Sequence, residues 1–182
     1  MRALTAARVT LRTVARGDLP QIEPWYAEAV ATAHSLREQP PDETLERRFS
    51  DAEASDTGLL LIAKADDPAP IGLLQYRLGF PDKGWLAIDF LALAAGCRGW
   101  GYGSEAVRLV GDGAVDSRKA KRFLAEVDTR NGLALYFWLR LGYRPARADE
   151  VFWRAPDEDG IIAMVREGTL RSKRSGRHLP PH

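Results

Sequence analysis

Three glycines at alternate positions, Gly99, Gly101 and Gly103, precede a predicted helix and carry the strongest chemical signal in the chain. Glycine adopts backbone conformations that other residues avoid, and it lets a ligand come close to the main chain. At the start of a helix, such a loop directs backbone N–H groups at an anion. The spacing therefore predicts a phosphate-binding loop.

Two phosphate-binding motifs match this loop only in part. A P-loop needs a lysine directly after its glycines, and none follows here, which excludes that motif. The dinucleotide fingerprint GxGxx[G/A] fits Gly101, Gly103 and Ala106. Glu126 lies 20 residues further on, where a ribose-binding acid is expected. That fingerprint normally opens its fold, whereas 96 residues precede Cys97 in this chain, so the dinucleotide interpretation is the weaker one.

A carboxylate in an apolar strand is a candidate for acid–base chemistry. Asp89 is the only charged residue in the predicted strand 85–93, where a carboxylate is costly unless it is paired or used. Period-two alternation predicts that Asp89 shares one face of this strand with Leu91 and Leu93. A structural Asp that bonds a neighbouring loop is the competing interpretation.

Further reactive side chains are weaker candidates. Glu126 and Asp128 lie on one face of the predicted strand 121–128, although acids near the end of a strand are usually solvated. Cys97 lies near a predicted helix start but has no histidine close in sequence. A free cysteine in such a setting is expected to be an inert core residue.

Hydrophobic periodicity and Gly/Pro positions predict the elements that must hold these residues. The predicted strands are 8–14, 58–64, 71–80, 85–93 and 121–128, followed by a hairpin of 151–155 and 161–167. The predicted helices are 17–34, 42–54, 104–117 and 131–142. This order predicts a mixed α/β fold whose sheet begins with an antiparallel meander.

Composition narrows the classes of function. The chain has 182 residues and a formal net charge of +1, which gives no overall field toward nucleic acid. No apolar run approaches the roughly 18 residues of a membrane span. One cysteine allows no intrachain disulfide, and no His/Cys cluster suggests a metal site, which favours a cytoplasmic protein. We expect one domain over 1–168 and a basic tail over 169–182, with neither nucleic acid nor membrane as partner.

Three longer segments resemble a known family. The segment FLALAAGCRGWGYGSEAV resembles the central acetyl-CoA motif of the GNAT superfamily of N-acetyltransferases, a strand followed by [RQ]xxGx[GA] and a helix. Arg98, Gly101 and Gly103 match that motif. EVDTRNGLALYFWLRLGYRP is similar to the family's strand–Asn–helix segment, and VTLRTVARGDLPQIEPW to the branch with ribosomal-protein and aminoglycoside acetyltransferases. Two motifs in order, within residues 8–166, are far more specific than the glycines alone.

The resemblance implies a fold and a cofactor, acetyl-CoA. The implied fold is a strongly twisted mixed sheet with helices on both faces. It has a V-shaped split between the fourth and fifth predicted strands, 85–93 and 121–128, where the pantetheine arm would lie. The residues implied in cofactor binding are Leu91, Leu93, Arg98, Gly99, Trp100, Gly101, Tyr102, Gly103, Ser104, Asn131, Ala134 and Trp138.

The implied chemistry is direct attack of a primary amine, on a small molecule or a protein, on the thioester. Asp89 is the first catalytic candidate, since members of the family often carry a carboxylate on this strand, and Glu126 is the second. The family's usual proton donor is a tyrosine seven residues after the asparagine, but here that position holds Trp138, whose indole cannot release its proton. Tyr136 lies roughly 200° around the helix and cannot simply substitute. The residues expected around the acceptor are Trp25, Tyr26, His34, Asp89 and Trp153.

Two other interpretations stay open at this point. Trp138 is compatible with a non-catalytic acyl-CoA-binding or regulatory module, and the glycine spacing with a dinucleotide-binding protein. The sequence decides neither the acceptor amine nor the length of the acyl group. A homodimer also stays open.

Overall fold

The protein is built on an eight-stranded mixed sheet. The computed structural model describes residues 4–6, 8–31, 44–54, 57–153 and 160–168. Across the sheet the strands follow the order β1-β2-β3-β4-β5-β6-β8-β7. Their bounds are β1 Leu4–Thr5, β2 Val9–Thr13, β3 Thr57–Lys64, β4 Pro70–Leu78, β5 Trp85–Leu93, β6 Arg122–Asp128, β7 Arg144–Pro145 and β8 Ile161–Glu167. Neighbouring strands pair antiparallel, except that β5 and β6 run parallel.

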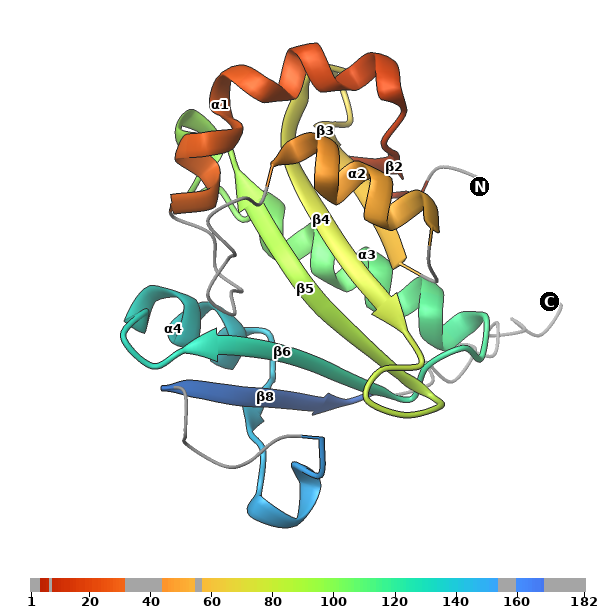
Figure 1. Cartoon of the computed structure of the whole chain (residues 1–182), viewed down its shortest axis with the longest axis vertical. Helices are drawn as coiled ribbons and strands as arrows, with labels where there is room; N and C mark the ends of the chain where they lie inside the picture. The colour runs from red at the N-terminus through yellow and green to blue at the C-terminus, as the bar shows by residue number, and fades with distance from the viewer. Residues whose placement is uncertain (1–3, 7, 32–43, 55–56, 154–159, 169–182) are drawn as a thin grey trace, which may run out of the picture.

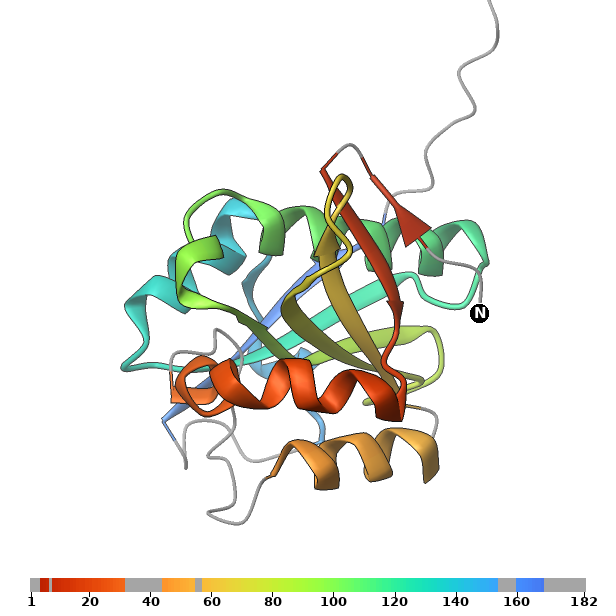
Figure 2. The same ribbon diagram turned by 90° about the horizontal axis from the view of Figure 1, so that it is seen from above.

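Helices cover both faces of this sheet (Figures 1 and 2). One face carries α1 and α2, and the opposite face carries α3 and α4. Their bounds are α1 Leu19–Ala31, α2 Leu45–Ala54, α3 Tyr102–Asp116 and α4 Gly132–Arg140. Short 3₁₀ helices span Arg16–Asp18, Ala95–Cys97 and Ala148–Glu150.

The hydrophobic core follows the two faces. The larger cluster packs against α3 and α4 and includes Leu91, Phe123 and Trp138. A second cluster packs against α1 and α2 and includes Tyr26 and Phe90. The predicted mixed α/β sheet with helices on both faces is therefore confirmed. In the part of the chain that the structure describes, no helix is both long enough and apolar enough to span a membrane.

The parallel strands β5 and β6 separate along their length. They pair only from Trp85 with Arg122 to Ile88 with Ala125. Beyond that point the carboxyl halves of the two strands diverge, as Figure 1 shows, and β6 continues to pair with β8 on its other side. This confirms the predicted V-shaped split. Asp89 and Glu126 are the first residues past the last pair, so they lie at its vertex.

A β-bulge interrupts β5 at this vertex. Gln75 of β4 pairs with Phe90, but the next residue, Tyr76, pairs with Ile88. Asp89 is therefore an extra residue between two pairs. A bulge of this kind bends its strand and redirects the side chains that follow.

The bulge overturns one prediction about faces. Leu91 and Leu93 pack toward the core under α3 and α4. Asp89 instead forms an ion pair with Arg77, which is in register with Ala87, a member of a different apolar cluster. The prediction that Asp89 shares a face with Leu91 and Leu93 is therefore wrong, because strict alternation fails at a bulge.

The last hairpin also differs from the prediction. β8 pairs with β6 and with β7, and residues 151–153 form no strand. The predicted hairpin of 151–155 with 161–167 is therefore wrong for the described residues 151–153. The segment after β7 is held by side chains instead, since Trp153 packs with Phe80 and Trp85 in an apolar cluster.

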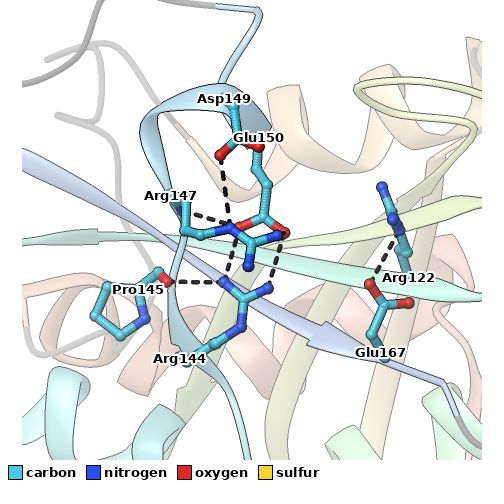
Figure 3. A network of polar contacts seen from close by, with 7 residues as sticks. All are labelled: Arg122, Arg144, Pro145, Arg147, Asp149, Glu150 and Glu167. Atoms are coloured by element: carbon cyan, nitrogen blue, oxygen red, sulfur yellow. Dashed lines mark hydrogen bonds and ion pairs between the residues drawn. The ribbon is translucent and has the colours of Figure 1, made fainter.

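Ion pairs anchor this same segment (Figure 3). Glu150 accepts two hydrogen bonds from the Arg144 guanidinium, at 2.7 and 2.8 Å, and one from the backbone N–H of Arg147 at 2.9 Å. Nearby, Arg122 and Glu167 form an ion pair of 3.1 Å. Every guanidinium drawn in Figure 3 thus faces a carboxylate.

Candidate active site

The glycine loop has the backbone that its sequence predicts. Gly99 has φ 78° and Gly101 has φ 85°, both in the left-handed region where a side chain is disfavoured. Gly101 is the N-cap of α3. The first N–H groups of a helix have no partner within it, so the first turn of α3 offers donors to an anion.

Arg98 joins this loop to the end of β5. Its Nε donates to the Leu93 carbonyl at 2.9 Å, and its Nη1 forms an ion pair of 3.3 Å with Glu28 of α1. Its Nη2 is buried and has no hydrogen-bond partner among the residues that the structure describes. A buried donor of this kind is costly unless something binds it. An anion at the loop would supply the missing acceptor.

A cleft of about 590 Å³ extends from this loop. Eight of the residues expected to bind the cofactor line it, namely Leu91, Leu93, Arg98, Gly99, Trp100, Gly101, Gly103 and Ser104. The structure thus brings the glycine loop and the end of β5 together as expected. The lining does not include the other four, Tyr102, Asn131, Ala134 and Trp138.

Seven lining residues were not expected from the sequence, namely Arg8, Ala92, Arg108, Leu133, Tyr136, Phe137 and Arg140. Helical spacing could have indicated some of them, because Arg108 lies one turn after Ser104 and Arg140 one turn after Tyr136. Arg8 gives no such signal, since only the folded sheet brings it to the loop. The lining contains four arginines and no carboxylate.

Arg8 fastens the start of β2 to the glycine loop. Its Nε donates to Glu105 at 3.0 Å, and its Nη1 donates to the Trp100 carbonyl at 2.9 Å. Its guanidinium also lies 5.6 Å from the centre of the Tyr102 ring. Arg8 therefore helps to fix the loop and adds positive charge to the cleft.

Helix α4 presents different residues to the cleft and to the core. The Asn131 side chain caps the helix by accepting a hydrogen bond from the Ala134 N–H at 2.9 Å. Trp138 is fully buried and packs edge-on against Phe137 and Tyr143. Tyr136, by contrast, lines the cleft with 60% of its surface exposed. The side chain at the family's tyrosine position is thus a core residue here.

The two predicted catalytic carboxylates lie at the vertex of the split. Asp89 accepts two hydrogen bonds from Arg77, at 2.6 and 2.8 Å. The hydrogen bonds that Arg77 donates to Asp89 raise the pKa of its guanidinium, and the negative charges of Asp89 and Glu126 raise it further. Glu126 accepts a hydrogen bond of 3.1 Å from the indole N–H of Trp153. The structure therefore gathers Asp89, Glu126 and Trp153 around Arg77. The sequence analysis did not predict a role for Arg77.

Asp128 has a different partner. Arg130 binds its carboxylate through the guanidinium, with a closest distance of 2.5 Å, and through the backbone N–H. These hydrogen bonds lower the pKa of Asp128 to about 2. Such a carboxylate is a poor base near neutral pH.

The residues expected around the acceptor are dispersed. Tyr26 is a core residue of α1 whose hydroxyl accepts a hydrogen bond of 2.9 Å from Arg48. Trp25 packs against the same cluster and is half-buried. Only Trp153 and Asp89 belong to the group around Arg77. His34 lies outside the described residues.

Comparison with known proteins adds the family. The family model for an acetyltransferase (GNAT) domain matches residues 8–144. No curated protein matches this chain.

Several solved structures share the fold. A GNAT-family protein from Chromobacterium violaceum has a TM-score of 0.73 and 18% identity, over 91% of this chain and 86% of its own. The Salmonella typhimurium acetyltransferase that modifies the N-terminal serine of ribosomal protein L7/L12 has a TM-score of 0.71 and 12% identity, over 91% and 99%. Spermidine N-acetyltransferase from Vibrio cholerae, in complex with CoA and spermine, has a TM-score of 0.68 and 16% identity, over 90% and 97%.

At identities of 12% to 18%, these similarities show the fold alone. The family model covers most of the chain and includes both the glycine loop and α4. This chain therefore belongs to the GNAT acetyltransferases.

Proposed function

We propose that this protein transfers an acetyl group from acetyl-CoA to a primary amine of a small molecule or a protein, by direct attack of the amine. The observation that carries the proposal is the cleft at the glycine loop. It joins the N-terminus of α3 and four arginines to the part of β5 that has left β6. Membership of the family supports acetyl transfer in general, and the acceptor is our inference.

The chain's own residues fit acetyl-CoA at this cleft. The first turn of α3 and the buried Nη2 of Arg98 would hold the diphosphate. Beyond Ile88, β5 has no strand beside it on the β6 side among the described residues. Its backbone around Leu91 and Leu93 can therefore bond an extended arm as a further strand would. When bound, acetyl-CoA supplies an acyl group activated as a thioester.

The carboxylates at the vertex receive the amine. Arg77 already holds both oxygens of Asp89, so Asp89 is better suited to fix Arg77 and to attract an ammonium group than to take up a proton. Glu126 lies near the Arg77 guanidinium as well, and the Trp153 indole N–H orients its carboxylate. We assign proton removal to Glu126, directly or through water, and positioning to Asp89.

Departure of the thiolate needs no tyrosine in this scheme. A thiol has a pKa of about 8.5, so a thiolate can leave near neutral pH without full protonation. Trp138 is held in the core, which is consistent with a packing role. Tyr136 is the hydroxyl-bearing side chain of α4 that lines the cleft.

Calorimetry with CoA tests the cofactor assignment. We expect binding by the wild-type chain, and Arg98→Gln should weaken it at least tenfold because a charged donor to the diphosphate is lost. The matched control is Arg122→Gln, which removes a guanidinium remote from the cleft. Absence of binding at millimolar CoA would refute the assignment. A fluorescence titration with NADH tests the alternative of a dinucleotide-binding protein, which requires that NADH binds.

Acetyl transfer to a panel of amines tests the reaction. The solved relatives act on a polyamine and on a protein N-terminus, so the panel should hold spermidine, an N-terminal serine peptide, an aminoglycoside and an amino acid. Glu126→Gln should lower kcat about a hundredfold, the lower range for loss of a general base, with CoA affinity unchanged. Asp89→Asn should mainly raise KM for the amine. Binding of CoA without turnover of any amine would favour the non-catalytic alternative.

A further inference from the structure

The charged group around Arg77 lies between two apolar surfaces on one face of the sheet. Residues an even number apart on a strand share a face, and so do residues in register on paired strands. Leu73, four residues before Arg77 on β4, belongs to the apolar cluster under α1 and α2. Ala87, in register with Arg77, belongs to a separate apolar cluster that also includes Leu124, two residues before Glu126. The charged group therefore borders this second cluster directly.

Two aromatic side chains of that cluster contact the charged group. The centre of the Phe80 ring lies 3.7 Å from the guanidinium carbon of Arg77. The Trp153 indole donates its hydrogen bond to Glu126, and the centre of its ring lies 6.4 Å from that of Phe80. Phe80 and Trp153 thus stand next to the carboxylates to which we assign the acceptor amine.

Part of this aromatic surface is open to solvent. Phe152 exposes 63% of its surface and packs edge-on against Trp153, with ring centres 5.3 Å apart. Phe80 and Trp153 are half-buried. Exposed aromatic surface gains free energy when an apolar group covers it, and aromatic pairs add to this gain. Beside carboxylates, such a surface suits a molecule with a cation at one end and a flat apolar ring at the other.

The carboxylates on these strands are poorly suited to a second ammonium group. Arg77 binds both oxygens of Asp89, and Arg130 binds Asp128. Glu126 is the carboxylate that we assign to the reacting amine. A polyamine carries further ammonium groups, and each of them loses hydration at a site unless an anion pairs with it. The charges of the site therefore favour an acceptor with a single positive charge.

We propose that the acceptor is a primary amine with one positive charge and an aromatic ring, and that the ring docks on Phe80, Phe152 and Trp153 while the amine reaches Glu126. This rests on the proposed function, whose acceptor class it names. The ammonium first gives one proton to Glu126. Its nitrogen then bonds the acetyl carbon, the C–S bond breaks with its electron pair on sulfur, and the second proton leaves to solvent. The three aromatic side chains set specificity and take no part in this transfer.

Acetyl transfer to three amines tests the proposal, with kcat/KM measured from the release of thiol by the full chain. The probes are 2-phenylethylamine, ethylamine, which lacks the ring, and spermidine, which replaces the ring by further charges. Wild type should prefer 2-phenylethylamine to each of the others by at least tenfold, because the ring is buried against the three aromatic side chains.

Two variants test the aromatic side chains themselves. Phe152→Ala removes an exposed ring, so it should leave the fold intact, and thermal unfolding checks this. It should lower kcat/KM for 2-phenylethylamine about tenfold more than for ethylamine. Phe80→Leu should act in the same direction, since it keeps apolar volume but loses the flat ring. Leu139→Ala is the matched control, because Leu139 is also exposed but belongs to α4, on the opposite face of the sheet (Figures 1 and 2).

Each other result has a definite meaning. Wild type that acetylates spermidine or ethylamine as well as 2-phenylethylamine overturns this proposal and leaves the proposed function intact. Equal losses for 2-phenylethylamine and ethylamine in both variants also overturn it, because the rings would then support the catalytic groups and not the acceptor. Binding of CoA without turnover of any amine overturns both this proposal and the proposed function.

Two peptides distinguish the sources of such an amine. Faster transfer to a peptide that begins with phenylalanine than to one that begins with serine supports the proposal and indicates a protein N-terminus as the acceptor. Preference for 2-phenylethylamine with transfer to neither peptide supports the proposal with a small molecule as the acceptor. Faster transfer to the serine peptide than to all the aromatic probes overturns it.

Discussion

Arginines serve two purposes in this molecule, and the two regions that contain them differ in charge balance. Around Glu150, the guanidinium groups of Arg144 and Arg147 face carboxylates, as Figure 3 shows. In the cleft, Arg108 and Arg140 have no such partner among the described residues, and Arg98 keeps a buried donor unsatisfied. The guanidinium charges of the first region are paired with carboxylates, whereas part of the positive charge in the second region is unpaired.

The difference separates charge that stabilises the fold from charge that is available to a ligand. A carboxylate held by several donors keeps a segment without strands in place, as Glu150 does for the chain after β7. Guanidinium groups without a carboxylate partner, such as those of Arg108 and Arg140, stay available to an anion that enters the cleft. The following predictions convert one kind of region into the other.

The largest effect is expected from placing a carboxylate in the cleft. Ser104→Glu puts an acid one turn before Arg108, in the first turn of α3, where it would pair with that arginine. CoA affinity should fall a hundredfold or more, because the new negative charge repels the diphosphate in a cleft whose lining otherwise has no carboxylate. Calorimetry measures this loss.

The same variant should be at least as stable as wild type. An acid in the first turn of a helix gains about 0.3–1 kcal/mol from the helix dipole. Ser104→Gln is the control of equal size, and thermal unfolding compares the two. If Ser104→Glu binds CoA as well as Ser104→Gln does, the cleft is not an anion site.

The opposite change should occur around Glu150. Glu150→Gln removes the carboxylate partner of Arg144 and one of the two carboxylates near Arg147, at a site where the Glu150 side chain is only 10% exposed. We expect a loss of about 1–2 kcal/mol in the free energy of unfolding, between the values for exposed and buried pairs. CoA affinity should stay unchanged. Denaturant unfolding and calorimetry give the two readouts, and a loss of CoA binding without a loss of stability would contradict the distinction between the regions.

The contribution of Glu150 should disappear in acid. Hydrogen bonds from Arg144, then from the Arg147 backbone, lower the pKa of Glu150 from its ordinary 4.5 to about 2. Because the folded-state pKa is lowered, this stability is present above pH 4.5 and is lost as the pH falls toward 2. The difference in Tm between wild type and Glu150→Gln should shrink over that range. A constant difference would mean that the variant acts through packing.

Much of the fold was predictable because it rests on local patterns. The strands around Asp89 and Glu126 are apolar runs. The glycines of the loop indicate positive φ angles, because glycine is the residue that adopts them readily. The bulge at Asp89 was not predictable, since it arises from the register between β4 and β5 and has no pattern within β5. The strand assigned to 151–155 is wrong for the described residues 151–153, because Val151 and Trp153 pack their side chains into an apolar cluster without pairing as a strand.

The site was predictable along the chain but not across it. Residues 98–104 and Leu91 and Leu93 follow one another in sequence, and a motif of that kind can be read directly. Arg8 is brought to the loop by the fold, about 90 residues away in sequence, so spacing gives no sign of it. At α4, the family's tyrosine position predicted that Trp138 contacts the cofactor, whereas Tyr136 and Phe137 line the cleft.

The smallest predicted effect tests an ion pair at the cleft itself, between Arg8 and Glu105. Arg8 lines the cleft and is paired with Glu105, so it holds the loop as well as adding charge. Glu105→Gln removes a carboxylate next to the anion site and frees the Arg8 guanidinium for a ligand. Arg8 keeps its hydrogen bond to the Trp100 carbonyl and its contact with Tyr102, so the loop should stay in place.

Two opposing effects decide the result for Glu105→Gln. The unfolding free energy should fall by about 0.5–1 kcal/mol, because an ion pair with a half-exposed arginine contributes no more than that. CoA affinity should rise two- to threefold at low salt, and this gain should vanish as salt screens the charges. Glu46→Gln, which breaks an exposed ion pair with Arg16 away from the cleft, is the control and should leave CoA affinity unchanged. A fall in CoA affinity for Glu105→Gln would mean that the pair matters more for holding the loop than for its charge. Arg8 would then stabilise the fold, as Arg144 does, and would not serve the ligand.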